Sequence, residues 1–295
     1  MTADHAQTRN AKAYNARLLR VLHHIEDHLD EDLSVEALSG IAAFSKFHFH
    51  RQFAATFDIG VYRYVQLARL KRASVKLAYR EDAVLDVALD SGYEGPEAFA
   101  RAFKRALGQS PSGFRAQPDW APWHDTFAPL QEIRAMHLKQ AFAFDDVIVR
   151  EDEAVPIAEL VHHGSPQKVG DTIRRFIEVR KANDLPPPRH ATYNLLYADP
   201  NESPDDYRLG LCVATDRDLS AHGLVANAIP SGRVAVLRYA GFSDDLRDAV
   251  AWFYGQWLPQ SGEELRDFPI YVQRVKFFPE VAENEAVTDI FLPLK

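Results

Sequence analysis

Arg51 and Arg101 are the side chains whose type and position indicate the most specific chemistry in this chain. A guanidinium group can donate two hydrogen bonds to one guanine in the major groove of DNA. The residues around both arginines match at an offset of fifty, so that Ser34–Tyr64 is repeated, with changes, as Val84–Phe114. The aligned pairs are Ala37 with Val87, Phe49 with Phe99, Arg51 with Arg101, Phe53 with Phe103, Phe57 with Leu107 and Tyr64 with Phe114. A repeat of this length indicates one duplicated supersecondary unit.

Each copy reads as a helix, a short turn and a second helix that carries basic residues. In a helix-turn-helix the second helix enters the major groove, and a chain with two such units can hold two groove segments by itself. We therefore expect binding to double-stranded DNA, with one chain sufficient. The predicted DNA-binding residues are Ser45, Lys46, Phe47, His50, Arg51, Glu97, Ala98, Arg101, Lys104 and Arg105.

The two copies differ in what they offer to DNA. Phe49 and Phe53 lie four residues apart and face the core, so Lys46, Phe47, His50 and Arg51 face outward. Arg51 suits guanine, and Phe47 suits the methyl group of thymine. Glu97 either accepts a hydrogen bond from cytosine or only offsets the helix dipole at its N-terminus. The remaining basic residues are expected at phosphates or in water, and they are Lys104, Arg105, Arg69, Lys71, Arg72 and Lys76.

Apolar periodicity and capping residues define the helices that must position these side chains. Apolar steps of three and four predict a helix over residues 14–29, and Ser34 and Ser45 are placed as N-caps of the next two. Gly92 and Gly108 end the first and second helices of the second copy. The predicted helices around the repeat are 46–57, 61–79, 84–91 and 96–107.

Charge separates the chain into unlike parts. Residues 1–120 hold 16 Lys and Arg against 15 Asp and Glu, whereas residues 121–295 hold 18 against 27. Since phosphate affinity depends on the local patch, the net charge of −8 does not exclude DNA binding. The excess of acidic residues in 121–295 indicates a different module, in which we expect no second DNA surface. Cys212 is the single cysteine, residues 1–9 are polar, and no run approaches about 18 apolar residues. We expect a cytoplasmic protein without disulfide, signal peptide or membrane span.

The second part of the chain predicts a different fold. Residues 117–141 combine prolines with Trp120, Trp123 and Phe127, which indicates a linker between domain 1–116 and domain 142–295. Beyond it, Ala158–Gly164 matches Ala235–Gly241 at an offset of 77. The predicted strands are 147–150, 157–162, 192–197, 207–215, 224–228, 234–239, 271–277 and 288–293. We expect an all-α double helix-turn-helix domain followed by an α+β domain with a duplicated strand-helix-strand-strand unit and a cleft along its pseudo-twofold axis.

The first domain resembles the DNA-binding domain of AraC-type bacterial transcription regulators. The resemblance spans roughly residues 14–116 and is carried by residues 33–42, 44–53, 87–93, 99–105 and 108–115. Asp58 and Val61 stand where the family has Gly and Pro, whereas the second copy keeps Gly108 and Pro111. The resemblance implies a sequence-specific transcription regulator that also contacts RNA polymerase.

The second domain resembles the GyrI-like effector-binding domain of multidrug-responsive regulators, on residues 236–242, 257–262 and 288–294. The resemblance implies an aromatic cleft with a buried Glu for lipophilic, often cationic molecules. At the position of that Glu this chain has Val272 or Gln273, so either the effector is not cationic or another acid serves. The candidate effector-binding residues are Glu159, Tyr193, Tyr197, Tyr239, Trp257 and Tyr271.

Other chemistry is weakly indicated. His24 and His28 lack the further ligands that a metal site needs, and no phosphate loop, nucleophile elbow or cofactor fingerprint occurs. We expect no metal, no cofactor, no catalytic residues and no enzyme activity. Two alternatives for the second domain stay open: a hydrolase of reactive small molecules, with Glu159 and Tyr239 as its polar pair, and a ligand-free protein-interaction module.

Overall fold

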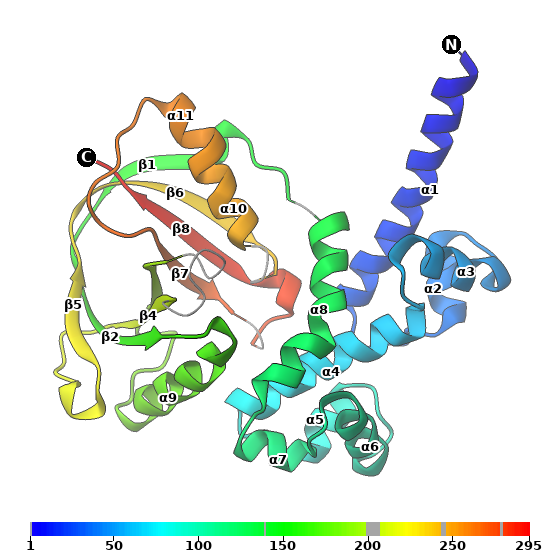
Figure 1. Cartoon of the computed structure of the whole chain (residues 1–295), viewed down its shortest axis with the longest axis horizontal. Helices are drawn as coiled ribbons and strands as arrows, with labels where there is room; N and C mark the ends of the chain where they lie inside the picture. The colour runs from blue at the N-terminus through cyan, green and yellow to red at the C-terminus, as the bar shows by residue number, and fades with distance from the viewer. Residues whose placement is uncertain (1, 139, 199–206, 243–245, 278–279) are drawn as a thin grey trace. The chain divides into compact units, whose positions relative to one another are not determined.

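The computed structural model describes residues 2–138, 140–198, 207–242, 246–277 and 280–295, with residues 2–13 described by their backbone alone. The chain divides into two compact units, Met1–Lys139 and Gln140–Lys295 (Figure 1). The first is helical and the second is built on one sheet, so the predicted order of an all-α part and an α+β part is found.

The first unit consists of helices. These are α1 (Thr2–Asp27), α2 (Val35–Ala42), α3 (Lys46–Phe57), α4 (Val61–Tyr79), α5 (Val84–Asp90), α6 (Pro96–Leu107), α7 (Pro111–Ala116) and α8 (Trp120–His137). The predicted bounds hold closely for α3 to α6, whereas α1 begins well before the predicted residue 14. Ser34 caps α2 as predicted, because its Oγ accepts a hydrogen bond from the Ala37 amide at 3.2 Å. Ser45 occupies the N-cap position of α3, but its side chain makes no capping hydrogen bond.

The repeat is visible in the packing of its aromatic residues. In the first copy Phe53 lies at 6.0 Å from Phe49 and at 6.0 Å from Tyr64, ring centroid to ring centroid. In the second copy Phe103 lies at 5.4 Å from Phe99 and at 5.5 Å from Phe114. These six side chains are fully buried. Each recognition helix is therefore held on its own core by the same arrangement of rings, which leaves its opposite face free.

Residues 117–141 differ from the predicted linker over most of their length. Residues 120–137 form α8, and α8 belongs to the first unit. Its aromatic residues are buried there, since Trp123 donates from Nε1 to Ser74 Oγ at 2.7 Å and Trp120 packs edge-on to Phe114. Three prolines and an irregular polarity pattern concealed this helix; Pro122 lies in its first turn and the Pro129 side chain is exposed.

α8 contacts both copies of the repeat. Near its middle, Thr126 Oγ1 donates to the Ala106 carbonyl at the end of α6 at 3.0 Å. At its C-terminal end, the His137 ring lies edge-on to Phe57 at the end of α3, with ring centroids 5.0 Å apart. One helix thus braces both recognition helices inside the unit.

The turns that follow α3 and α6 share one backbone conformation. Gly108 ends α6 at φ +73°, and Asp58 ends α3 at φ +54°. The replacement of the family's Gly by Asp58 therefore keeps the left-handed turn, at a steric cost that glycine would not incur.

The described residues of the second unit form eight strands, one at each predicted stretch. They are β1 (Val147–Asp152), β2 (Val155–His163), β3 (Thr192–Leu196), β4 (Arg208–Ala214), β5 (Val225–Ile229), β6 (Gly232–Ala240), β7 (Tyr271–Lys276) and β8 (Val287–Pro293). They pair antiparallel in the order β1-β6-β8-β7-β3-β4-β2-β5. The helices α9 (Val169–Ala182), α10 (Leu246–Trp252) and α11 (Leu258–Ser261) connect them, with a π-helical turn at Phe253–Trp257.

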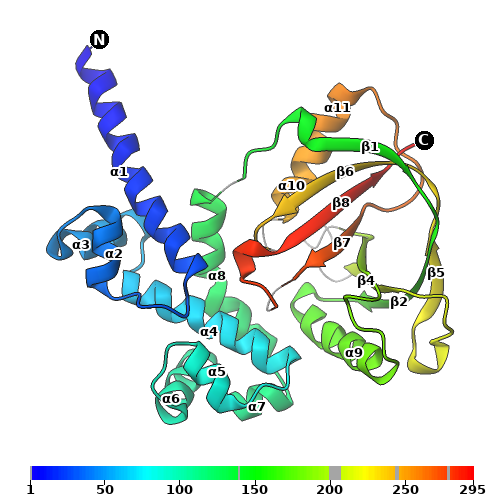
Figure 2. The same ribbon diagram turned by 180° about the vertical axis from the view of Figure 1, so that it is seen from behind.

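The sheet is curled so that its two ends approach each other. β1 is the edge strand at one end of the sheet and β2 is the second strand from the other end, yet only Glu153 and Ala154 separate them in the chain (Figures 1 and 2). Pro230 and Ser231 likewise connect β5 to β6. Since a chain of three residue steps spans at most about 11 Å, the two ends must come close together at both connections.

The two faces of the curled sheet are covered differently. One face packs on the helices, through Phe176 of α9 and through Phe253 and Trp257 beside α10. The other, which we call the concave face, buries residues that come only from strands and loops among the described residues. They are Ile157, Leu195, Cys212, Ile229, Val234, Val236, Tyr271 and Phe291.

Candidate functional site

The α3 side chains predicted to contact DNA share one exposed surface. Ser45, Lys46, Phe47, His50 and Arg51 are all exposed, while Phe49 and Phe53 beside them are completely buried. Phe47 is 77% exposed, which is unusual for so large an apolar ring and leaves it available to a partner. The Lys46 ammonium lies 3.4 Å from Glu36 and 5.7 Å from the centre of the Phe47 ring.

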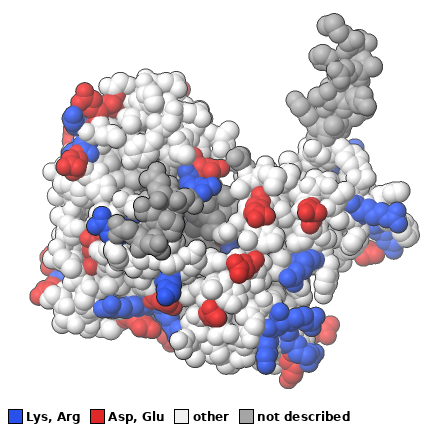
Figure 3. Space-filling model, in the orientation of Figure 1, with Lys and Arg blue, Asp and Glu red and all other residues white. Residues whose placement is uncertain are grey.

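The equivalent surface of α6 is also exposed, at Glu97, Ala98, Arg101, Lys104 and Arg105. Pro96 at its first turn and the left-handed Gly108 at its end fix the length of this helix. Lys and Arg side chains gather over α3 and over α6 on the face shown in Figure 3. Both helices therefore combine an anchored core side with a cationic outer side.

The basic residues of α4 lie in a different setting from the one predicted. Lys71 is buried with its ammonium 5.9 Å from the Trp123 ring, and buried Lys76 lies 2.6 Å from Asp90. Arg69 donates to the carbonyls of Leu29 and Glu31. The phosphate prediction is wrong for these three, because α4 is the central helix of the unit and its cations stabilise the fold.

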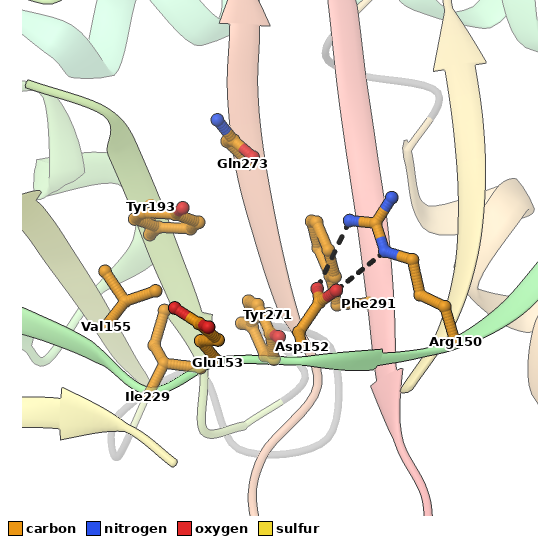
Figure 4. A pocket seen from close by; sticks show the side chains of 9 residues that line it. All are labelled: Arg150, Asp152, Glu153, Val155, Tyr193, Ile229, Tyr271, Gln273 and Phe291. Carbon is orange, nitrogen blue, oxygen red and sulfur yellow. Dashed lines mark hydrogen bonds and ion pairs between the residues drawn. The ribbon is translucent and has the colours of Figure 1, made fainter. Parts of the chain in front are cut away.

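The concave face contains a small open pocket of about 180 Å³ where the two ends of the sheet meet (Figure 4). Its aromatic part is formed by Tyr193, Tyr271 and Phe291, with the last two rings stacked at 4.7 Å and 6°. The remaining lining residues are Arg150, Asp152, Glu153, Val155, Ile229 and Gln273. Arg150 is paired with Asp152, with Nε–Oδ1 at 2.7 Å and Nη2–Oδ2 at 3.2 Å.

Burial raises the pKa of Tyr193 and raises that of Tyr271 further, and the nearby Asp152 carboxylate adds to both shifts. Both phenols therefore stay neutral over the physiological pH range. They offer ring faces and hydroxyl groups to a ligand, and they contribute no negative charge.

Glu159 lies on the concave face but does not line this pocket. It is almost completely buried, and its carboxylate accepts hydrogen bonds from Tyr197 Oη and from Asn227 Nδ2, each at 2.8 Å. Burial and the neighbouring Glu159 raise the pKa of Tyr197, so this phenol remains a donor. Cys212 is buried nearby and burial raises its pKa as well, which makes it a packed and unreactive thiol.

Two of the predicted effector residues lie on the other side of the sheet. Tyr239 and Trp257 belong to the core beneath α10, and Tyr239 Oη donates to the Phe242 carbonyl at 3.1 Å. The structure thus brings Tyr193 and Tyr271 together in the pocket, places Glu159 and Tyr197 beside each other on the same face, and separates Tyr239 and Trp257 from both pairs. Glu159 and Tyr239 consequently cannot act as the polar pair of a hydrolase.

Sequence reasoning missed most of the polar lining of the pocket, namely Arg150, Asp152 and Glu153. Their signal was available in part: the offset of 77 and the two-residue gaps at 153–154 and 230–231 mark equivalent positions in the two halves. The sequence pattern did not contain the pairing order, which places β1 at one end of the curled sheet and β2 beside the edge strand β5 at the other.

Neither a metal site nor a membrane span is found in the described parts of the chain. No three His, Cys, Asp or Glu side chains gather there as a metal ion would require. His24 and His28 stack with ring centroids 4.2 Å apart on α1. None of the helices in the described ranges is long and apolar enough to cross a bilayer.

Comparison with known proteins places both units. Residues 145–295 match the GyrI-like small molecule binding domain, and residues 38–117 match a helix-turn-helix domain. The chain is 29% identical over 153 residues to the probable transcriptional regulator YgiV of Escherichia coli K12, which covers 50% of this chain and 96% of YgiV. It is 22% identical over 252 residues to the right origin-binding protein of the same organism, covering 80% of this chain and 82% of that protein. It is 36% identical over 102 residues to the HTH-type transcriptional regulator YbfP of Bacillus subtilis, covering 35% of each.

An exposed helix-turn-helix pair joined to a sheet domain with an open aromatic pocket defines a ligand-binding transcription regulator. This chain belongs to the GyrI-like family, and its GyrI-like small-molecule binding domain follows an AraC-type DNA-binding region.

Proposed function

We propose that this protein reads a specific DNA site through α3 and α6 and responds to a lipophilic small molecule bound in the pocket of its concave face. The observation that carries the first part is the exposed, cationic side of two recognition helices whose opposite sides are fully buried. The second part rests on the three aromatic rings that line the pocket.

The proposed base contacts come mainly from α3. Arg51 would pair with guanine, and the exposed Phe47 would lie against a thymine methyl group. On α6, Arg101 would read a second guanine, with Ala98 beside it and Glu97 at the helix start. Ser45, Lys46, His50, Lys104 and Arg105 would contact phosphates or neighbouring base edges and thus fix the register of the protein on DNA.

One chain is proposed to suffice for binding. Because α8 contacts the ends of both recognition helices, the two helix-turn-helix units are held together in one chain without a partner. RNA polymerase is a further proposed partner, which the regulator would contact while it is bound to DNA. The effector can change DNA binding or polymerase contact only if it binds two conformational states of the regulator with different affinities.

We propose no enzymatic role for the second unit. Among its described residues, the polar pair considered for hydrolysis is divided between the two faces of the sheet. The relatives YgiV and YbfP are named as transcriptional regulators. Cytoplasmic localisation remains our expectation from sequence.

We also infer that the sheet unit arose by duplication. If β1–β4 are exchanged one for one with β5–β8, the strand order of the sheet is the same order read from the other end. In addition, the bounds of β2 and β6 differ by 77 residues at both ends. The pocket would then lie close to the axis that relates the two halves.

The DNA contacts are tested by Arg51→Ala and Arg101→Ala, measured by fluorescence anisotropy on a set of operator variants. Each substitution should weaken binding by about 1–3 kcal/mol and relax selectivity at one base pair, whereas Arg20→Ala on exposed α1 removes the same charge without that effect. An equal loss on every sequence, with a salt slope lower by about 1, would instead assign the two arginines to phosphates.

A further inference from the structure

The charges that line the concave pocket are either paired within the protein or screened by water. The Arg150 guanidinium is paired with the Asp152 carboxylate at 2.7 and 3.2 Å, so these two charges offset each other. Glu153 lies in the connection between β1 and β2, where its side chain is exposed and water screens its charge. The Tyr193 and Tyr271 phenols stay neutral. An ion that left water for this pocket would therefore find little to replace its hydration.

Gln273 contributes a neutral polar group to the same pocket. It lines the pocket and is half-buried, and among the described residues its amide has no hydrogen-bond partner. Figure 4 shows this side chain at the end of the pocket opposite Glu153 and Ile229. A glutamine amide holds two N–H donors and a carbonyl acceptor in one plane. A donor and an acceptor are thus available to a ligand, and no hydrogen bond within the described protein has to break.

Strand register places this amide beside the aromatic rings. Gln273 follows Tyr271 by two residues on β7, so both side chains lie on the same face of the sheet. Gln273 is the register partner of Tyr193 on β3, and Tyr271 is that of Phe291 on β8. The Tyr193 and Tyr271 rings lie 6.3 Å apart at 62°, centroid to centroid. A flat ligand packed on these rings can therefore turn one polar edge toward the amide.

The unused amide also makes the pocket selective. A ligand that covers it with an apolar edge leaves a donor and an acceptor without water, which weakens binding. A ligand whose own acceptor and donor lie side by side satisfies both groups of the amide at once. A site built in this way discriminates most strongly against an analogue that lacks the hydrogen-bonding group.

From this arrangement we infer that Gln273 is the specificity-determining residue of the pocket and selects neutral, planar aromatic molecules that carry an amide edge, such as a lactam or a carboxamide. The inference rests on the proposed function, because it takes the concave pocket as the effector site. The aromatic rings hold the body of the ligand, and the Gln273 amide pairs with its N–H and its carbonyl. The effector is accordingly uncharged.

The test compares three bicyclic probes of similar size by ligand-detected NMR titration of the full chain at pH 7. 2-Quinolinone has an N–H beside its carbonyl, coumarin has an oxygen in place of that N–H, and N-methylquinolinium is a cation. The wild-type chain should bind 2-quinolinone about three- to ten-fold more tightly than coumarin, and N-methylquinolinium no more tightly than coumarin. Gln273→Met should abolish the preference for 2-quinolinone, because methionine has a similar length and no amide. Retained binding of coumarin shows that the variant keeps the pocket.

Gln260→Met provides the matched control. Gln260 is exposed on α11, outside the pocket lining, and its amide donates to the Gln256 carbonyl at 2.9 Å. The Gln260→Met variant should keep the preference of the wild-type chain. Tyr193→Leu removes one of the rings that line the pocket and should weaken the binding of all three probes.

The outcomes separate the inference from the proposed function. A preference for 2-quinolinone that survives Gln273→Met, or tighter binding of N-methylquinolinium than of 2-quinolinone by the wild-type chain, would overturn the role of Gln273. The pocket would then remain the proposed effector site, provided that Tyr193→Leu still weakens binding. Failure of the wild-type chain to bind any probe, or binding that Tyr193→Leu leaves unchanged, would overturn the pocket as effector site, and the inference with it.

Discussion

Replacement of Arg134 by methionine would break a buried ion pair that ties α8 to the rest of the helical unit. Arg134 on α8 donates from Nε to Glu26 Oε1 at 3.0 Å and from Nη2 to Glu26 Oε2 at 2.7 Å. The side chains of Arg134 and Glu26 are 1% and 3% exposed. The Tyr64 hydroxyl on α4 donates to the same carboxylate, so three helices meet at Glu26.

The magnitude follows from burial and separation. At an effective dielectric constant of about 20, two unit charges this close attract by roughly 5 kcal/mol. Removal of the guanidinium leaves Glu26 buried with one phenol as its remaining donor here, and the loss of one partner from such a pair costs about 3–5 kcal/mol. Methionine fills much of the vacated volume, so most of this loss would be electrostatic.

Differential scanning calorimetry measures the effect. The transition of the helical unit should move down by roughly 10–20 °C, and the transition of the sheet unit should stay in place. Operator affinity at elevated temperature should fall with the first transition, because α8 braces both recognition helices. Asp30→Asn, which removes an exposed pair with Arg72 at 3.8 Å in the same unit, should cost less than about 1 kcal/mol.

A double variant separates the charge effect from packing. With Glu26→Gln added, no unpaired charge remains buried, and much of the lost stability should return. A loss below about 1 kcal/mol for Arg134→Met alone, or no recovery in the double variant, would show that the pair does not hold α8 in place and that the reasoning is wrong.

Two further substitutions test local geometry. Gly210→Ala should destabilise the sheet unit by about 1–3 kcal/mol in thermal unfolding, since an added Cβ would lie 2.2 Å from Glu159 Oε1 and 3.1 Å from Leu195 Cβ; Gly255→Ala, which meets nothing within 4 Å, serves as its control. Asp58→Gly should stabilise the helical unit by about 0.5–1 kcal/mol because it relieves a left-handed residue at φ +54°, and Asp58→Ala should not stabilise it; equal unfolding temperatures for the two variants would contradict this account.

Local sequence signals were sufficient for most elements of this fold, with α8 as the main exception. The bounds of α3, α4 and α6 follow from apolar periodicity and from caps such as Gly108, and strand-forming runs located all eight strands. The candidate DNA surface followed as well, because the burial of Phe49 on one side of α3 leaves Arg51 on the other side.

The failures have a common cause in long-range contacts. α8 was missed because three prolines outweigh its local helix signal, whereas its stability comes from buried contacts of Trp123 and Arg134 with distant helices. Tyr239 and Trp257 were assigned to the pocket because aromatic composition does not tell which face of a sheet a residue occupies. A side chain's face depends on strand register, and the neighbours of a strand depend on pairing order.

The sequence by itself therefore determined that a helix-turn-helix unit is repeated at an offset of fifty and where each recognition helix lies. It also determined that an α+β unit follows. These features can be predicted because helix periodicity, caps and turns act over a few residues. Only the tertiary structure decided which charges are free. The buried cations of α4 are used by the core, Glu159 is used by Tyr197 and Asn227, and Glu153 alone among the pocket-lining residues carries an uncompensated charge. That distinction depends on which side chains meet in space, and strand pairing and helix packing settle it after local structure has formed.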